Sequence, residues 1–455
     1  MKKFIAVCFL VVVATFLSSC TNYCKKADQL RMEYKYDEAV KLYQKAADGG
    51  DAYAIWRLAD AYANGLGVEF NQEKALELFK KSAEQDCEEA IIDLGTVYLY
   101  GIFNVPVDTV KGADLVNKIA EKSQNPYVLY RYAYLYLDGI ENYFDKDHQK
   151  AVEIMERIKD KENPYYLLLK GEMYAWGTES ITQDVSKARP LLEKAFSNGL
   201  DGAAYVMAAT YMNQKDKDGI RRAIEWLKKG ANVGNTRCMY YLATIYSSDD
   251  PEMQSYHNSK EAHSLLEKAA KCGNAAACVD LGSWYLDEDN VENDDAKAFE
   301  YFKLADKYGS TEGSRKLGQC YWNGWGCDKN VKEAEKYWTK AALEGDAMAS
   351  YFLALRYTDG TFLWNEGNYK KYLELAAAKG YDFALFDLGT NYREGIFGYP
   401  KDKQISFSYL KKGADLGCAH CCDMLSIYYK AGIGCSKDKK KSEEYAKKAK
   451  ELFDK

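Results

Sequence analysis

Hydrophobic residues recur at helical spacing along the chain, and the whole arrangement repeats at a nearly constant interval. In the stretch 54–64, Ala54, Leu58 and Tyr62 stand at positions i, i+4 and i+8, which share one face of a helix with 3.6 residues per turn. Tyrosines equivalent to Tyr62 follow every 35 to 39 residues, at Tyr98, Tyr136, Tyr174, Tyr211, Tyr246, Tyr285, Tyr321, Tyr357, Tyr392 and Tyr429. A period of this length predicts a solenoid of helical repeats.

A second helical stretch follows the first in each unit. Ala75, Phe79 and Ala83 place a large residue between two small ones, so that neighbouring helices approach closely while the large side chain fills the gap. Glycines then close the helices, as Gly49 does after a second helix and Gly65 after a first one. A left-handed closing residue costs least where there is no Cβ.

The repeats begin at Tyr23 with an abbreviated unit, in which Leu30 and Tyr34 keep the spacing of the later ones. With this unit, the pattern predicts 12 helix pairs that end near Phe453. The chain has only six prolines, and no linker rich in Pro, Gly or Ser interrupts the series. We therefore expect an all-α superhelical solenoid, with residues 24–455 in one continuous domain, because each unit buries its core against its neighbours.

The unit resembles the Sel-one-like repeat, a relative of the tetratricopeptide repeat. The sequence LADAYANGLGV at 58–68 carries the resemblance imperfectly, and the stretches 94–101, 317–326 and 388–395 carry it more clearly. It extends from Tyr23 to the C-terminus. The resemblance implies a scaffold that holds a peptide or a partner protein on its concave surface.

Two units depart from the pattern. Tyr132 and Lys170 occupy the position that leucine fills elsewhere. We expect looser or locally bent packing in the units that contain them.

The N-terminal residues have a different character from the repeats. Lys2 and Lys3 precede an apolar run, 4–17, which is shorter than the ~20 residues that a membrane-spanning helix needs. This arrangement predicts a signal peptide over residues 1–19. The stretch 17–20, Leu-Ser-Ser-Cys, resembles the lipobox of bacterial lipoproteins, which implies that Cys20 is lipidated, with 20–23 as the lipidated N-terminus. An ordinary signal peptide cut nearby is the alternative.

Lipidation would anchor the protein in the cell envelope through its N-terminal lipid. Thr21 follows the cysteine, and by the same resemblance it favours the outer membrane. The 62 basic and 68 acidic residues are spread evenly along the chain, with a net charge of −6. This balance argues against a nucleic-acid partner, which needs a clustered basic face.

The sequence offers no clear arrangement of catalytic residues. The four histidines lie in different contexts, no phosphate-binding or HExxH motif is present, and the carboxylates fall at helix positions expected to be exposed. We therefore expect a protein that is not an enzyme and has no cofactor.

The densest group of candidate metal ligands is Cys418, His420, Cys421 and Cys422. Thiolates and imidazole are ligands for zinc. However, Cys421 occupies the small-residue position of the repeat, so an apolar filling role is the simpler interpretation and we expect no metal. Disulfides between Cys272 and Cys278, or between Cys418 and Cys422, remain open alternatives.

The resemblance also implies which residues line the concave groove. In a tetratricopeptide-like scaffold the first helix of each pair faces inward, and there the residue two before the leucine position points into the groove. Together with aromatic residues just after the repeated tyrosine, this gives the candidate binding residues Trp56, Tyr100, Tyr130, Trp176, Tyr205, Tyr240, Arg315, Trp322, Tyr351 and Phe386. Aromatic residues and arginine dominate binding hot spots. The alternative is that these rings lean onto the neighbouring repeat and form part of the core.

The function that these patterns favour is an envelope-anchored scaffold that binds a protein or peptide in the cell envelope. Aromatic stripes also stack on sugar rings, so a carbohydrate- or peptidoglycan-associating module is the first alternative. A hydrolase acting on cell-wall material is the second, and it would need a His–Cys or Glu–Asp cluster in the groove.

Overall fold

The computed structural model describes residues 22–140, 142–214, 216–287, 294–358 and 364–454. These ranges are helical apart from turns and loops, and their only β-feature is an isolated bridge between Ile140 and Phe144. The chain divides into two compact units. The boundary along the sequence falls between Leu281 and Gly282, inside helix α15 (Ala275–Leu286). Unit 1 precedes this boundary and unit 2 follows it.

The helices of unit 1 begin with residues 22–32. They continue with α2 (Tyr36–Asp48), α3 (Ala52–Asn64), α4 (Gln72–Ala83), α5 (Glu88–Tyr100), η1 (Ile102–Asn104), α6 (Thr109–Ala120), α7 (Pro126–Asp138), α8 (His148–Glu156), α9 (Pro164–Trp176), α10 (Val185–Ser197), α11 (Gly202–Met212), α12 (Lys217–Asn232), α13 (Thr236–Ser247), η2 (Gln254–Tyr256) and α14 (Ser259–Lys271). Those of unit 2 after α15 are α16 (Asp295–Lys307), α17 (Thr311–Asn323), α18 (Val331–Leu343), α19 (Ala347–Thr358), α20 (Glu366–Ala378), α21 (Asp382–Glu394), α22 (Lys403–Asp415), α23 (Ala419–Ala431) and α24 (Lys439–Phe453). No helix in these ranges is both long and apolar enough to cross a membrane.

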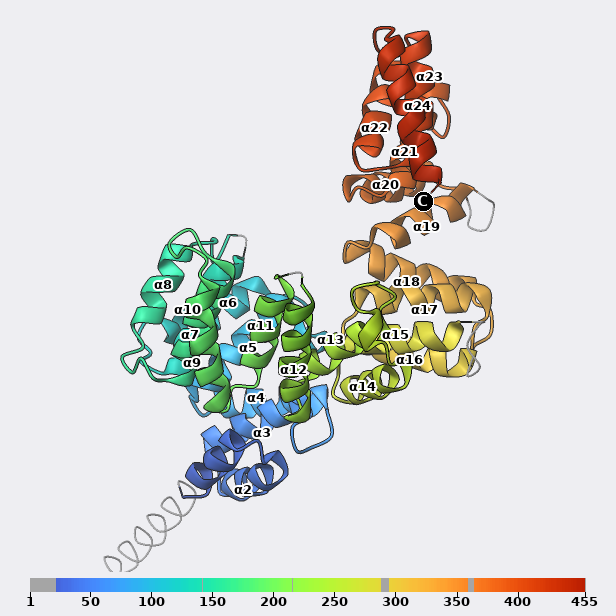
Figure 1. Cartoon of the computed structure of the whole chain (residues 1–455). Helices are drawn as coiled ribbons and strands as arrows, with labels where there is room; N and C mark the ends of the chain where they lie inside the picture. Colours follow the sequence, from blue (N-terminus) through green and yellow to red (C-terminus); the bar gives the residue numbers. More distant parts are fainter. Residues whose placement is uncertain (1–21, 141, 215, 288–293, 359–363, 455) are drawn as a thin grey trace, which may run out of the picture. The chain divides into compact units, whose positions relative to one another are not determined.

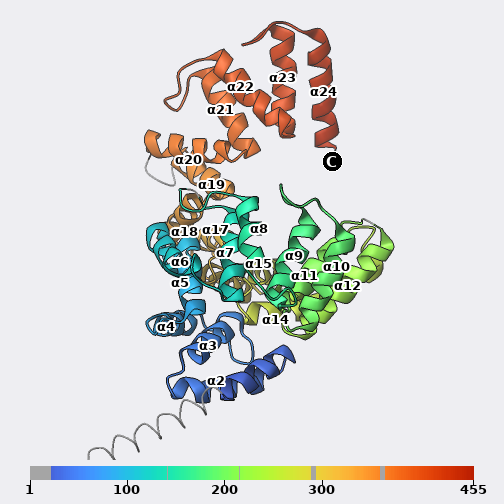
Figure 2. The same cartoon turned by 90° about the vertical axis from the view of Figure 1, so that its left-hand side faces the viewer.

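The predicted series of 12 helix pairs is confirmed within the described residues. The helix 22–32 pairs with α2, and then α3 pairs with α4, α5 with α6, and so on to α23 with α24 (Figure 1). In unit 1 the first helices of successive pairs also contact one another, α3 with α5, α5 with α7, α7 with α9, α9 with α11 and α11 with α13. Figure 2 shows α9 to α12 side by side as two such pairs. The first helices therefore form one continuous layer.

Local chemistry fixes where the helices begin and end. Asp51 caps α3 by accepting a hydrogen bond from the Ala54 amide at 2.9 Å, which satisfies one of the unpaired donors at the helix start. Gly65 closes α3 in the left-handed conformation, as predicted. After α2, however, Gly49 has a φ of −82° and Gly50 takes the left-handed conformation instead. The prediction for Gly49 was wrong by one residue, because α2 is followed by two glycines and the second makes the turn.

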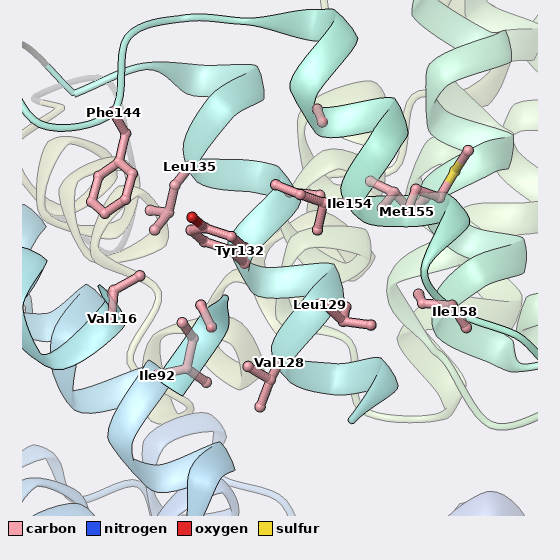
Figure 3. Packing of buried hydrophobic residues seen from close by; sticks show 14 of the residues in the cluster. Ile92, Val116, Val128, Leu129, Tyr132, Leu135, Phe144, Ile154, Met155 and Ile158 are labelled. Carbon is pink, nitrogen blue, oxygen red and sulfur yellow. The ribbon is translucent and has the colours of Figure 1, made fainter. Parts of the chain in front are cut away.

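A large cluster of buried residues in unit 1 lies between α5, α6, α7, α8 and α9 (Figure 3). Tyr132 stands in the middle of this cluster, only 3% exposed, with its ring edge-on to Phe144. The expectation of looser packing around Tyr132 is wrong, because the ring fills the space that a leucine fills elsewhere. What differs in this unit is the turn after α7, where Gly139 has a ψ of 140° rather than the 30° of Gly65.

Unit 1 curls so far that its first repeat contacts its fifth. The Tyr34 hydroxyl donates to the Phe196 carbonyl at 2.6 Å, and the two ring centroids lie 5.5 Å apart. Farther along the chain, Phe70 after α3 lies against Gly273 after α14. The inner side of this unit is therefore narrow.

Candidate functional site

A pocket of about 340 Å³ opens on the first-helix layer of unit 1. Five consecutive repeats contribute to it. Its lining comes from α5 (Thr96, Tyr100), α7 (Tyr130, Arg131, Tyr134, Leu135, Asp138), α9 (Leu168, Glu172), α11 (Gly202, Tyr205, Val206) and the start of α13 (Asn235, Arg237). Pockets that bind small ligands or side-chain groups begin at about this volume. Four tyrosine rings and four ionisable groups make it an aromatic pocket with charges at defined places.

Glu172 is the central acidic group of this pocket. Its Oε2 accepts a hydrogen bond from the Tyr134 hydroxyl, which comes from the preceding repeat. Burial raises the pKa of Glu172 to about 7, with Asp138 adding to the rise, while the Tyr134 hydroxyl and Arg237 act in the opposite direction. A carboxyl group whose pKa lies near neutral pH exchanges its proton readily when a ligand changes the local charge.

The two arginines of the pocket differ in their surroundings. Arg131 is tied to the buried carboxylate of Asp93, with Nε 3.3 Å from Oδ1. Arg237 is exposed, and its guanidinium lies over the Tyr205 ring, 4.6 Å from the centroid. Arg131 is therefore part of the framework, whereas Arg237 forms a charged rim beside an aromatic face.

Tyr205 connects this pocket with two others. A second pocket of about 340 Å³ shares Tyr134, Glu172, Tyr205 and Arg237 with the first and adds Trp176. A third, of about 410 Å³, lies between α11, α12 and α13 and is lined mainly by apolar groups, among them Ala208, Met212, Leu227, Tyr241 and Ile245. Adjoining pockets of polar and apolar character suit neighbouring side chains of one extended segment.

The structure places four of the predicted groove residues of unit 1 around these pockets. Tyr100 and Trp176 are 43% and 47% exposed, and Tyr130 and Tyr205 are half-buried. Tyr240 lies beside Tyr241, with ring centroids 5.6 Å apart, outside the linings described above. Whether these residues bind a partner stays a prediction.

Trp56 differs from the other predicted groove residues of unit 1, because it is a core residue. It is 1% exposed, and its indole Nε1 donates to Asp93 Oδ2 at 2.8 Å. The Tyr127 hydroxyl donates to the same carboxylate at 2.8 Å, so that three successive repeats meet at Asp93. The expectation that Trp56 is exposed in the groove is wrong, because its polar atom finds a partner inside the repeat stack.

In unit 2 the predicted residues are engaged within the protein. Arg315 is buried and donates to Asp346 at 3.1 Å and to Glu312 at 2.7 Å. The remaining three are half-buried. Tyr351 donates to Asp387 at 3.0 Å, Trp322 lies under the Arg356 guanidinium at 4.7 Å, and Phe386 packs on His420 at 5.6 Å. Arg315 is therefore not an exposed binding residue, because two carboxylates hold its guanidinium.

The cysteine-rich segment of unit 2 lies in the core. Cys418, Cys421 and Cys422 are buried, whereas His420 is exposed and packs on Phe383, Phe386 and Phe453. The eleven cysteines of the described residues are free thiols, so neither Cys272–Cys278 nor Cys418–Cys422 is bonded in this structure. Across the same residues, no group of three His, Cys, Asp or Glu side chains is arranged to hold a metal ion. Cys20 lies outside the described residues.

The charged residues of the pocket were not among the predicted ones. Glu172 was passed over because carboxylates at helix positions were expected to be exposed. A signal was nevertheless present, since Tyr134 and Glu172 lie four residues after the inward positions Tyr130 and Leu168. Residues four apart share a helix face, so extending the inward stripe by one turn finds both.

A family model described as Sel1 repeat matches eleven segments, residues 29–51, 52–87, 88–123, 126–162, 171–200, 202–235, 236–274, 275–305, 311–346, 382–418 and 419–452. The chain belongs to the Sel1 repeat family. The helix pair of α19 and α20 falls between two matched segments, and the structure shows that it continues the series. The resemblance of the repeat unit to the Sel-one-like repeat is thereby confirmed, and so is the all-α repeat fold.

Two curated proteins illustrate the relationship. The chitin synthase regulator SKT5 of Saccharomyces cerevisiae is 26% identical over 215 residues, which are 45% of this chain and 31% of that protein. The DAP3-binding cell death enhancer 1 of Rattus norvegicus is 28% identical over 212 residues, 45% of this chain and 40% of that protein. The matches thus span less than half the length of these relatives.

A solved structure of similar extent is c5321, a protective antigen of uropathogenic Escherichia coli strains that displays an SLR fold. It is 23% identical, the match covers 91% of this chain and 89% of that one, and the TM-score is 0.49.

Proposed function

We propose that this Sel1 repeat protein is a binding scaffold that holds an extended segment of a partner protein on the inner face of unit 1. The observation that carries the proposal is the set of adjoining pockets across the first helices, joined at Tyr205. Repeat solenoids use such surfaces to bind extended partners. The names of the two curated relatives, a regulator and a protein that binds another protein, agree with a scaffold role.

The pocket walls are prepared for binding without large rearrangement. Tyr130 is held between Tyr134 and Tyr165, with centroids 5.0 and 5.5 Å away, and Tyr205 is held between Tyr241 and Arg237. Side chains that are already fixed lose little conformational entropy when a partner docks. Tyrosine and tryptophan supply large contact areas with few rotatable bonds.

Two exposed tyrosines of unit 1 give a matched test. Tyr100→Ala removes a ring that lines the first pocket, whereas Tyr143→Ala removes a ring of similar exposure, 40%, that lies outside the three linings. The tagged full chain is cross-linked in its own cells and the captured proteins are identified. We expect Tyr100→Ala to lose a partner that wild type and Tyr143→Ala retain. Equal capture by all three proteins would contradict the placement of the site.

We also propose that the scaffold is tethered to the cell envelope through a lipid on Cys20, in the outer membrane. The support is the sequence 17–20 and the threonine that follows it. Metabolic labelling with a palmitate analogue should mark the wild-type chain and leave Cys20→Ser unlabelled. Label on Cys20→Ser, or its absence from wild type, would exclude this anchor.

A glycan ligand is the second candidate, favoured by the exposed rings of Trp176 and Tyr100 beside the carboxyl groups of Glu172 and Asp138. Rings and carboxyl groups of this kind stack on and hydrogen-bond to sugars, and a carboxyl pair is also what glycoside hydrolysis needs. Purified peptidoglycan tests both. Binding that is lost in Trp176→Ala supports the glycan module. Release of soluble fragments that stops in Glu172→Gln supports a hydrolase. If wild type neither binds nor cleaves peptidoglycan, the protein-binding scaffold is the remaining candidate.

A further inference from the structure

We propose that the pocket centred on Glu172 receives a lysine side chain of the partner protein, with the ammonium group donating to the free oxygen of the Glu172 carboxylate. This inference rests on the proposed scaffold function and specifies the chemistry of its site. The partner segment would place the stem of this lysine between the tyrosine rings of α7 and α11.

Charge complementarity favours a cation in this pocket. Arg131 is compensated by Asp93 at 3.3 Å. The remaining ionisable groups of the lining are one cation, Arg237, and two carboxylates, Asp138 and Glu172. When both carboxylates are ionised, these three groups carry a net charge of one negative unit. A single positive ligand therefore neutralises the site.

The aromatic lining adds to this preference. Tyr100, Tyr130, Tyr134 and Tyr205 all contribute to the wall of the pocket. The face of an aromatic ring attracts a cation, and the attraction grows when the cation is removed from water. The Arg237 guanidinium over Tyr205 shows that this wall already accommodates one cation within the protein.

The hydrogen bonding of Glu172 selects lysine over arginine. Its Oε2 is occupied by the Tyr134 hydroxyl, whereas Oε1 has no hydrogen-bond partner among the described residues. Arginine pairs best with a carboxylate through two parallel hydrogen bonds, which need both oxygens. The ammonium group of lysine is a compact charge that needs only one.

Lysine binding is coupled to loss of a proton from Glu172. Because the pKa of the free carboxyl is about 7, about half of the molecules must release this proton to solvent at neutral pH before the ammonium ion pairs with the carboxylate. The charged and titratable groups around Glu172 are Tyr100 on α5, Tyr130, Arg131, Tyr134 and Asp138 on α7, Tyr205 on α11, Arg237 on α13 and His148 at the start of α8. Lysine itself stays charged over this range. Affinity should therefore fall about fivefold from pH 7 to pH 6 and about tenfold for each further pH unit.

Fluorescent hexapeptide pools, acetylated and amidated at their ends, test the inference on the full chain. Separate pools fix lysine, acetyl-lysine, norleucine, arginine or glutamate at one central position. We expect the lysine pool to bind wild type at least about tenfold more tightly than the others. Glu172→Gln should abolish the preference and its pH dependence, because glutamine still accepts from Tyr134 but carries no charge.

One variant serves as the control. Glu153→Gln changes an exposed glutamate of α8 that lies outside the three linings. It should keep the lysine preference and the slope with pH. Equal binding of the lysine and norleucine pools, or stronger binding of the arginine pool, would overturn the lysine inference while leaving the peptide-binding scaffold intact. Absence of binding by every pool would overturn both.

Discussion

The inward-facing positions differ between the two units, although both units are built from the same kind of repeat: those predicted in unit 2 are engaged within the protein, whereas unit 1 has both engaged and pocket-lining ones. In unit 2, Tyr351 reaches the next repeat and donates to Asp387, which stands directly before the leucine position there. Trp56 in unit 1 does the same with Asp93. Where no carboxylate stands at that place in the next repeat, the ring packs on neighbouring aromatic rings and lines a pocket. Tyr130 and Tyr205 are followed there by Leu169 and Tyr241, and at these repeats the pockets open.

This difference teaches that one acidic position decides whether an inward ring belongs to the framework or to the surface. A buried ring whose polar atom has a partner stabilises the stack. A ring without such a partner remains available to a ligand. Substitutions that remove either a framework ring or a surface ring, and leave the rest of the repeat unchanged, test this distinction.

The largest effect is expected from Trp56→Ala. The change leaves a cavity in the core of unit 1 and takes one donor from the buried Asp93 carboxylate. We expect a loss of about 3–5 kcal/mol in the free energy of unfolding of this unit, seen as a lower melting temperature. An unchanged melting temperature together with weaker partner binding would show that Trp56 is a binding residue of the groove and not a core residue.

Arg315→Ala tests the framework of unit 2. Removal of the guanidinium leaves Asp346 and Glu312 without their shared cation, and we expect a loss of about 2 kcal/mol. Lys336→Ala is the matched control, because its ion pair with Glu333 is exposed and should contribute less than about 0.5 kcal/mol. Similar melting temperatures for the two variants would show that Arg315 does not hold the framework.

The fold was readable from the sequence because it depends on a signal repeated many times. Each small–large–small stripe is weak alone, but their common period leaves one architecture that satisfies them all. Errors arose where a single residue had to be assigned. Gly49 and Gly50 both lack a Cβ, and only the exact end of α2 decides which one turns.

The candidate site was predictable only in part. Helix periodicity and the family resemblance give the predicted inward face, and four of its residues, Tyr100, Tyr130, Trp176 and Tyr205, line the pockets. They do not say which inward ring is tied to the next repeat, because that depends on a side chain about 36 residues away. They also miss Glu172, whose raised pKa comes from the enclosure that several repeats create together.

The pH dependence of stability tests whether the Glu172 carboxyl group of unit 1 is enclosed in the folded state. The pKa of Glu172 is raised on folding to about 7, so between its ordinary pKa of about 4.3 and 7 the folded state binds more protons than the unfolded state. Wild type therefore loses stability as pH rises through this window, on the order of 1–3 kcal/mol, and the loss ends above it. Glu172→Gln should not show this loss. Melting temperatures of both proteins from about pH 4.5 to 7.5 check it, and parallel curves would contradict the enclosed position of the carboxyl.

The smallest effect on stability is expected from Trp176→Ala. This ring is 47% exposed at the end of α9 and lines a pocket, whereas Trp322, one residue earlier in its repeat in unit 2, lies under Arg356 and beside Trp338. Exposed side chains outside packed contacts change stability by less than about 0.5 kcal/mol. Trp176→Ala should therefore melt like wild type and yet bind its partner less tightly, while Trp322→Ala should melt earlier. If both variants melt early, both rings have a structural role and the distinction between framework and surface rings fails at the C-terminal ends of the first helices.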